Sequence, residues 1–164
     1  MTERARTVTW EDPCAAAQAG LQMAGVDYLR AMAGGPVPAP PALLLIGAGL
    51  GTIEPGRIMT TLVPGEHHDN SLGTVHGGMI ATLLDSVMGC AVHSMLPAGR
   101  GYMTLELKMN FLRPVGDRTG VVTAEGVTVH VGRQSAEAEG KLRDAAGKIY
   151  AVASTTCLVL DVPK

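Results

Sequence analysis

A long, mostly apolar segment in the middle of the chain constrains the fold more than any other feature. Between Val75 and Met95, apolar side chains recur every three or four residues, at Ile80, Leu83, Leu84, Val87, Met88, Ala91 and Val92. This spacing is typical of an α-helix, and a helix with so few polar positions is normally buried. We therefore predict one long helix inside the domain, ended by the Pro97-Ala98-Gly99 sequence, with the other elements arranged around it.

The segments on both sides of this helix have the patterns of β-strands. Two strands are predicted before it, over 43–53 and 57–63, because Glu54-Pro55-Gly56 between them is a turn sequence. Four strands are predicted after it, over 102–111, 119–131, 134–143 and 148–160. In 102–111 the apolar residues occupy odd-numbered positions, which indicates one apolar face. The last three strands are joined by short turns and should form an antiparallel meander.

This order of elements predicts an α+β fold in which an antiparallel sheet wraps around one central helix. The edge strands of such a sheet are unpaired in a monomer, which favours pairing with the sheet of a second copy. Residues 42–164 would form this domain, with residues 1–41 as an N-terminal helical extension packed onto it. Asp12-Pro13 has the form of an N-cap followed by proline, so a helix is expected from there to about Met32. The segment 36–41 has four prolines in six residues and is predicted to be a stiff connector.

Composition and charge exclude several classes of function. A net charge of −2 provides no broad basic surface for nucleic acid, and 3% aromatic residues provide no platform for stacking bases. The longest apolar run, 42–50, is too short to span a membrane, and the N-terminus lacks an apolar signal sequence. A cytoplasmic protein without a nucleic-acid or membrane partner is therefore expected. The three cysteines are far apart and form no CxxC pair, which excludes a disulfide framework and a zinc knuckle.

The central helix carries two features that could support chemistry. Asp85 is an ionisable residue among apolar neighbours, so its carboxylate must find a partner or face a cleft. A catalytic role and a structural role, at an exposed helix edge or in a buried hydrogen bond, are both open at this point. Gly77 and Gly78 begin the helix, where free N–H groups and the helix dipole favour an anion or oxyanion. A glycine pair by itself more often serves packing.

The spacing of these two features predicts where a shared site would lie. Gly77 and Asp85 are eight residues apart, which is about 12 Å along a helix. A carbonyl held about 3 Å from the Gly77 amide cannot also meet Asp85 of the same helix. If both act on one substrate, they must come from two copies of the chain related by a two-fold axis. We therefore predict a dimer with two active sites at its interface.

Other chemistry-bearing residues favour less specific interpretations. His67 and His68 point to opposite sides of an extended segment, and HExxH is absent, so a solvated loop is favoured and no metal is predicted. The sequence has no GxSxG motif for a serine nucleophile, and Cys90 is expected to be a small core residue. The turn Gly132-Arg133-Gln134 is either an exposed hairpin turn or a phosphate contact, and Arg113 is a similar candidate.

Two motifs together point to a known family. Asn70-Ser71-Leu72-Gly73-Thr74-Val75-His76-Gly77-Gly78 is followed by Ala81-Thr82-Leu83-Leu84-Asp85, and then by four strands. This pattern resembles the signature of the hotdog-fold acyl-CoA thioesterases, and within them the phenylacetate-degradation (PaaI-type) branch. The resemblance covers about residues 43–160. It implies the hotdog fold, hydrolysis of an aryl-, short- or medium-chain acyl-CoA to free acid and CoA, and homodimers that often pair into homotetramers.

The resemblance also implies roles for individual residues. Asp85 would be the nucleophile or the general base, and the Gly77 N–H would polarise the thioester carbonyl. Asn70 would position the carbonyl or water, His76 would support that loop, and Thr104 matches a Ser/Thr position that can hold the water. No metal or redox cofactor is implied, because coenzyme A is itself part of the substrate.

Contacts are expected with both ends of the substrate. The phosphates of CoA would lie near Arg133, and near Arg113 as a second contact. The other residues expected to contact the substrate are Gly78, Leu84, Met88, Met103, Gly132 and Gln134. Of these, Leu84, Met88 and Met103 would line the tunnel for the acyl group.

Three alternative functions are weighed beside hydrolysis. A non-catalytic acyl-CoA-binding protein would keep the pocket and lose the acid, but Asp85 and Asn70 are both present. A purely structural assembly protein would not need the Asn70, Gly77 and Asp85 set. A hydratase or dehydratase of the same fold would use a His–Asp pair at the start of the helix. His76 is at that position, but Asp85 lies deep in the helix, which favours hydrolysis.

Overall fold

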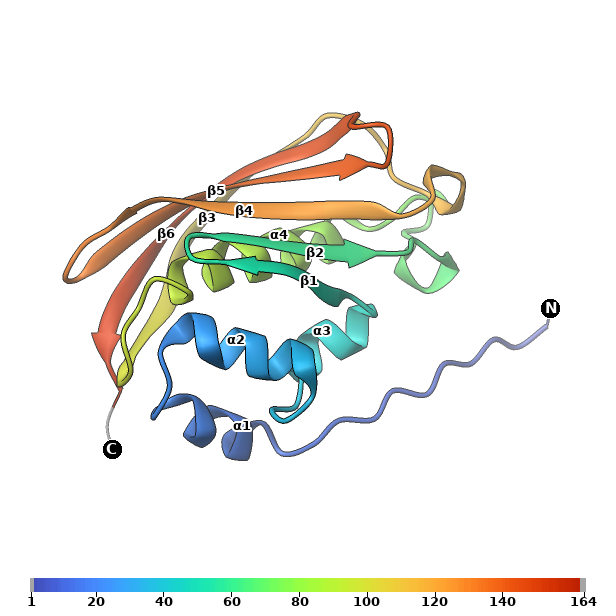
Figure 1. Ribbon diagram of the computed structural model, residues 1–164. Helices are drawn as coiled ribbons and strands as arrows, with labels where there is room; N and C mark the ends of the chain where they lie inside the picture. Colours follow the sequence, from blue (N-terminus) through green and yellow to red (C-terminus); the bar gives the residue numbers. More distant parts are fainter. Residues whose placement is uncertain (1, 163–164) are drawn as a thin grey trace.

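A curved antiparallel sheet surrounds the long helix α4 (Gly77–His93) in the computed structural model, which describes residues 2–162 (Figure 1). Within these residues the strands are β1 (Gly49–Glu54), β2 (Arg57–Leu62), β3 (Arg100–Phe111), β4 (Val122–Val131), β5 (Ser135–Asp144) and β6 (Ile149–Asp161). Their order across the sheet is β1-β2-β4-β5-β6-β3, and all neighbouring pairs are antiparallel. The predicted fold class and the β4-β5-β6 meander are confirmed. The strands β1 and β3 form the two edges.

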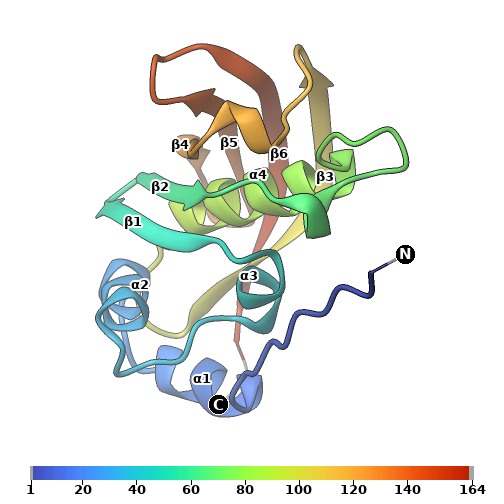
Figure 2. The same ribbon diagram turned by 90° about the vertical axis from the view of Figure 1, so that its right-hand side faces the viewer.

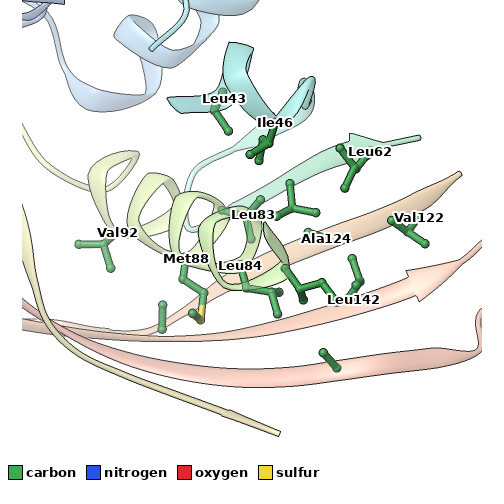
Figure 3. Close-up of a cluster of buried hydrophobic side chains, with 14 of the residues drawn as sticks. Leu43, Ile46, Leu62, Leu83, Leu84, Met88, Val92, Val122, Ala124 and Leu142 are labelled. Carbon is green, nitrogen blue, oxygen red and sulfur yellow. The ribbon is translucent and has the colours of Figure 1, made fainter. Parts of the chain in front are cut away.

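The core lies between α4 and the concave face of the sheet (Figure 3). Five helix residues are completely buried there, namely Leu83, Leu84, Val87, Met88 and Val92. Their partners on the strands include the small residues Ala124 and Ala138. At Gly126 the backbone of β4 lies so close to the Val87 carbonyl that any side chain would overlap it. A chain with few aromatic residues thus fills its core by bringing backbones close together.

The start of α4 is set by the residue just before it. His76 is the N-cap, with extended backbone angles (φ −60°, ψ 134°), and its Nδ1 accepts a hydrogen bond of 2.9 Å from the Gly78 N–H. This bond satisfies one of the amides that a helix N-terminus leaves without partners. The helix predicted over 75–95 is confirmed, with ends that differ by two residues.

The N-terminal extension contains two helices where the sequence predicted one. The structure has α1 (Pro13–Gly20) and α2 (Gly25–Gly34), separated by a turn, so the single helix expected up to Met32 was wrong. Gly25 explains the break, because it is buried against the His93 carbonyl, where a side chain would overlap, and its N–H donates to the Leu96 carbonyl at 2.9 Å. Both helices lie on the side of α4 away from β5 and β6 (Figure 2).

The apolar run 43–53 is also not one strand. Its first part belongs to a short helix, α3 (Pro41–Ile46), and only β1 from Gly49 onward is extended. Pro41 stands at the first turn, where proline favours a helix, and Leu43 and Ile46 bury one helix face. Gly47 ends the helix with a left-handed backbone (φ 69°). Periodicity cannot distinguish helix from strand in so short an apolar run.

Two single turns of 3₁₀-helix complete the described elements, η1 (Glu66–His68) and η2 (Asp117–Thr119). They lie in the loops before α4 and after β3. No helix in residues 2–162 combines the length and the apolar character that a membrane span requires.

The contact between the extension and α4 predicts an acid-sensitive stability. The His93 ring lies edge-on to Tyr28 of α2, with ring centroids 5.6 Å apart, and burial lowers the pKa of His93. The unfolded chain therefore binds a proton more readily than the folded protein, so the free energy of unfolding should fall as pH drops below about 6.5. Urea unfolding at pH 7.5 and 5.5 measures this loss, and His93→Gln should reduce it. His130→Gln, at an exposed position, should leave the loss of unfolding free energy between these two pH values unaltered. An equal loss in His93→Gln and His130→Gln would contradict the prediction.

Candidate active site

The structure brings together two residues that the sequence placed nineteen positions apart. Asp85 lies in the middle of α4, and Thr104 lies on the edge strand β3. The Thr104 hydroxyl donates a hydrogen bond of 2.9 Å to Asp85 Oδ1. Both side chains are partly exposed, so the carboxylate is oriented by a protein donor and still accessible at the open edge of the sheet. A hydrogen bond to a charged carboxylate is stronger than one between neutral groups.

A β-bulge in β3 makes this contact possible. The register of β3 against β6 shifts between Thr104 and Glu106, which leaves Leu105 as an extra residue. Before the bulge, Tyr102 and Thr104 face the helix; after it, Leu107 and Met109 pack against the core. The expectation of one continuous apolar face on this strand is therefore wrong. A bulge reverses which residues face inward, and here it turns a hydroxyl toward Asp85.

The N-terminus of α4 presents one free amide. The Gly78 N–H is bonded to His76 Nδ1, and the N–H groups of Met79 and Ile80 donate to the His76 carbonyl. Within residues 2–162, no acceptor pairs with the Gly77 N–H. Its dipole and the helix dipole both point into the space beyond the helix end, which suits a developing oxyanion.

A cleft of about 360 Å³ opens over this helix end. Gly77 and Ile80 line it from α4, and Phe111 and Arg113 line it from the end of β3 and the loop that follows. A side chain at Gly77 would lie only 3.1 Å from the Phe111 ring. Glycine therefore keeps the backbone amide open to the cleft at a crowded position.

The side chain of Asn70 shapes the loop that leads into α4. Its Oδ1 accepts from the Leu72 N–H at 2.8 Å, and its Nδ2 donates to Thr74 Oγ1 at 3.0 Å. These bonds close a turn around Gly73, whose backbone is left-handed (φ 73°). The amide of Asn70 is thus held within its own loop. A direct contact with the carbonyl or the water stays a prediction.

One chain does not bring Gly77 and Asp85 together. They lie on the same helix, eight positions apart in sequence, so their separation along the axis is about 12 Å. Beside both of them runs β3, which pairs with β6 on one side and has no partner strand on its other side within the described residues. The two candidate groups are therefore arranged along an open sheet edge.

The arginines expected to contact CoA lie at opposite ends of β3. Arg113 follows the last residue of the strand, and its guanidinium donates to the Ile149 carbonyl. The turn Gly132–Gln134 lies beside the first residues of β3, where the Arg133 carbonyl accepts from Arg100 and the Gln134 carbonyl accepts from the Val159 N–H. The side chain of Arg133 is exposed. Within one chain these two cations do not form a common site.

The three residues expected to line an acyl tunnel are not together either. Leu84 and Met88 are completely buried, and both pack against Gly140 of β5, in the core below the helix. Met103 is 58% exposed and alternates with Thr104 on β3, so it faces away from Asp85. Their part in binding an acyl group stays a prediction.

Two thiols near Asp85 are held in the protonated state. Desolvation raises the pKa of Cys90 to about 12, with a further contribution from the charge of Asp85. Burial also raises the pKa of Cys157 on β6. Because the thiolate is the nucleophilic form, neither cysteine is suited to nucleophilic attack at neutral pH.

The histidine pair before α4 differs from the solvated loop that we expected. His68 is 2% exposed, its Nε2 lies 2.8 Å from the Ile46 carbonyl, and its Nδ1 accepts from the Gly65 N–H. It therefore joins the loop to α3, and only His67 is exposed. In the described part of the chain, no three metal-ligating side chains are grouped closely enough to hold an ion.

Sequence reasoning did not single out Tyr102 or Phe111 as site residues. The Phe111 ring lies at Gly77, and the Tyr102 ring lies at Gly89 on α4. A signal for Tyr102 was present in its position two residues before Thr104, which puts both on one face of the strand. For Phe111 the bulge removes that signal, because it changes the face on which later residues lie.

Comparisons with known proteins place the chain in a family. Residues 72–151, which include α4 and β3, match the model of the thioesterase superfamily. A provisionally named esterase of Saccharolobus solfataricus is 32% identical over 108 residues, 66% of this chain and 75% of that protein. Human acyl-coenzyme A thioesterase 13 is 32% identical over 82 residues, 49% of this chain and 54% of that protein. A third relative is a provisionally named esterase of Halobacterium salinarum. Across these three relatives, the matched part of this chain spans between 48% and 75% of the relative's length.

A solved structure extends the similarity to the whole fold. It is a provisionally named thioesterase related to phenylacetic acid degradation, from Ralstonia eutropha. The two chains are 28% identical with a TM-score of 0.73, over 80% of this chain and 98% of the other. Together with the sheet wrapped around α4, these similarities show that the chain belongs to the thioesterase superfamily and has its hotdog fold.

Proposed function

We propose that this protein hydrolyses acyl-CoA thioesters to free acids and CoA. The observation that carries the proposal is the Asp85–Thr104 pair, a carboxylate oriented by a hydroxyl at 2.9 Å beside an open sheet edge. The free Gly77 amide at the start of the same helix supplies the electrostatic partner that acyl transfer needs. The name of the human relative, acyl-coenzyme A thioesterase, supports the same substrate class.

The complete site would form between two copies of the chain. In one chain, Phe111 lies at Gly77 and Thr104 lies at Asp85. Antiparallel pairing of β3 with β3 of a second copy would place the Phe111 end of one strand beside the Thr104 end of the other. Gly77 of one chain would then approach Asp85 of the partner subunit. The large apolar side chains exposed on β3 support such an interface, with Met103 58%, Leu105 60% and Phe111 54% exposed.

The reaction would begin with the thioester carbonyl oxygen at the Gly77 N–H. Asp85 of the partner subunit would either take a proton from a water or attack the carbonyl carbon itself. In both routes a new C–O bond forms, the C–S bond breaks, and the sulfur leaves as a thiolate that takes up a proton. In the second route, water then hydrolyses the mixed anhydride on Asp85. Thr104 would hold the carboxylate, and the water where one is used, in position.

The same pairing would bring the two candidate phosphate contacts together. Arg113 follows the Phe111 end of β3, and Arg133 lies beside its other end. In an antiparallel dimer these opposite ends become neighbours. Two guanidinium groups from different chains would then flank the phosphates of one CoA. A dimer of such dimers stays an expectation.

The hydratase alternative requires a histidine with a free basic nitrogen at the helix start. His76 Nδ1 already accepts the Gly78 N–H, so this nitrogen acts as a helix cap. The geometry therefore favours hydrolysis, with binding without catalysis as the remaining alternative.

The purified chain and a panel of aryl-, short- and medium-chain acyl-CoA substrates test the proposal. Release of free thiol should accompany loss of the thioester, and the protein should elute as an oligomer. Absence of thiol release from a folded oligomer, together with measurable binding of the same acyl-CoA by calorimetry, would replace hydrolysis with acyl-CoA binding.

Removal of the Thr104 hydroxyl should lower turnover moderately. Thr104→Val keeps the branched shape but loses the donor at 2.9 Å from Asp85, so kcat should fall about tenfold, as for one hydrogen bond to a charged group. Thr104→Ser restores the donor and should recover most of the activity. Initial rates of thiol release at saturating substrate measure both variants; equal rates would show that the hydroxyl has no part in the reaction.

A further inference from the structure

The tyrosine two residues before Thr104 covers a glycine on α4. The Tyr102 ring and its hydroxyl lie so close to Gly89 that any side chain there would overlap them. The ring therefore occupies the groove that the missing side chain leaves on the helix. Close packing against this glycine thus helps to fix the position of the ring.

This contact lies one helical turn beyond the candidate catalytic carboxylate. Asp85 and Gly89 are four positions apart and thus share one face of α4. Tyr102 and Thr104 are two positions apart and share one face of β3. The two pairs lie side by side along the helix: Thr104 contacts Asp85, and Tyr102 contacts Gly89. Any group placed against the carboxylate therefore meets the Tyr102 ring in the direction of the helix C-terminus.

Other aromatic side chains hold this ring from behind. The His93 ring centroid lies 5.8 Å from that of Tyr102, and the Tyr28 ring of the N-terminal extension lies edge-on to His93 at 5.6 Å. Two of the three tyrosines of the chain are thus in one cluster. Contacts of this kind restrict how far Tyr102 can move aside.

We propose that Tyr102 is the end wall of the acyl site and restricts the substrate to short acyl chains. This inference rests on the proposed function and names its substrate class. A chain that extends from the reacting carbonyl past Asp85 toward Gly89 would have to displace the ring. On this proposal a short acyl group would end before the ring, whereas a medium chain would reach it. His93 and Tyr28 act as positioning residues, which gives the N-terminal extension a part in selectivity.

The test compares selectivity rather than activity alone. For wild type, Tyr102→Ala and Tyr102→Phe, kcat/KM is measured with acetyl-, butyryl-, hexanoyl- and octanoyl-CoA. Wild type should prefer the short substrates. Tyr102→Ala should raise the ratio of octanoyl to acetyl kcat/KM about tenfold or more, as expected for a pocket that accepts extra methylene groups. Tyr102→Phe keeps the ring and should keep the wild-type order of substrates. Val129→Ala, at an exposed position of β4 (60%), controls for general effects of truncation.

The outcomes separate this inference from the proposed function. If wild type hydrolyses acyl-CoA and Tyr102→Ala keeps the wild-type order of substrates, Tyr102 is not the end wall of the acyl site. The proposal that the protein is a thioesterase would not be affected. A uniform loss with all substrates would also overturn the end wall, since a purely structural residue behaves in that way. No hydrolysis by wild type would overturn both. If Tyr102→Ala does not fold, Tyr102→Leu fills more of the space and should shift the same ratio by a smaller factor.

Discussion

Asp85→Asn is expected to lower kcat for acyl-CoA hydrolysis roughly 10²- to 10⁴-fold, the range typical of a lost general base. The amide has nearly the same shape as the carboxylate, and it can still accept the hydrogen bond from Thr104, which is 2.9 Å long in the wild type. The fold and the binding of substrate should therefore persist. The amide can neither take a proton from water nor attack a thioester, so both routes that remain open for Asp85 are blocked.

Thiol release under single-turnover and steady-state conditions measures this loss. Asp27→Asn is the matched control, because Asp27 is an exposed residue of α2 that forms an ion pair with Arg30 at 3.7 Å, away from Asp85. It should behave as wild type. An Asp85→Asn protein with more than about a tenth of the wild-type kcat, well outside the range for a general base, would show that the carboxylate is structural and would leave the function of the α4–β3 edge unassigned.

Gly77→Pro is expected to reduce kcat about 10²- to 10³-fold relative to Gly77→Ala, as for removal of one oxyanion donor. Gly77 is the first residue of α4, where proline is well tolerated. The preceding His76 already has the extended backbone that proline requires before it (φ −60°, ψ 134°). Both variants add a Cβ about 3.1 Å from the Phe111 ring. They differ in that only proline removes the N–H.

The comparison of these two variants isolates the amide from the crowding at Phe111. Circular dichroism and the elution volume establish that each is folded and oligomeric, and kcat with saturating acyl-CoA gives the effect. Equal activities of Gly77→Pro and Gly77→Ala would contradict an oxyanion role for this N–H, whatever the absolute loss relative to wild type.

Mixed oligomers of the two inactive variants test whether the site is shared between chains. In a dimer of one Asp85→Asn chain and one Gly77→Pro chain, a site built from both chains is either doubly defective or fully intact. Coexpression with two affinity tags and sequential purification isolates this mixed dimer. Recovered thiol release would support the shared site, whereas inactivity would place each complete site within a single chain.

The elements that sequence could predict are those with a strong period. The helix that became α4 has apolar residues at a spacing of three to four over about four turns, which is the pattern of a helix and not of a strand. The strand β5 alternates between exposed and buried residues over most of its length, and β4 and β6 do so over about half of theirs. The Gly77 and Asp85 candidates followed from the same helix, because an amide at a helix start and an isolated carboxylate are local features.

The predictions of secondary structure were wrong where contacts between distant residues decide whether a segment forms a helix or a strand, or where a helix breaks. The apolar run before β1 is short enough to form either a helix or a strand, and Pro41 and the packing of Ile46 select the helix α3. The helix of the extension breaks because Gly25 docks against the His93 carbonyl. The residues next to Gly25 in the sequence do not indicate this contact, and neither do those next to His93.

Patterns within a few neighbouring residues were enough to predict the buried central helix, the antiparallel sheet and the two candidate groups of α4, because periodicity and helix geometry act over a few residues. Which strand residues meet these two groups depends on long-range pairing in the folded protein. The bulge at Leu105 turns Thr104 toward Asp85 and Tyr102 toward Gly89. A shift of one residue reverses the two faces of a strand, and such a shift depends on how β3 pairs with β6, forty or more residues further along the chain.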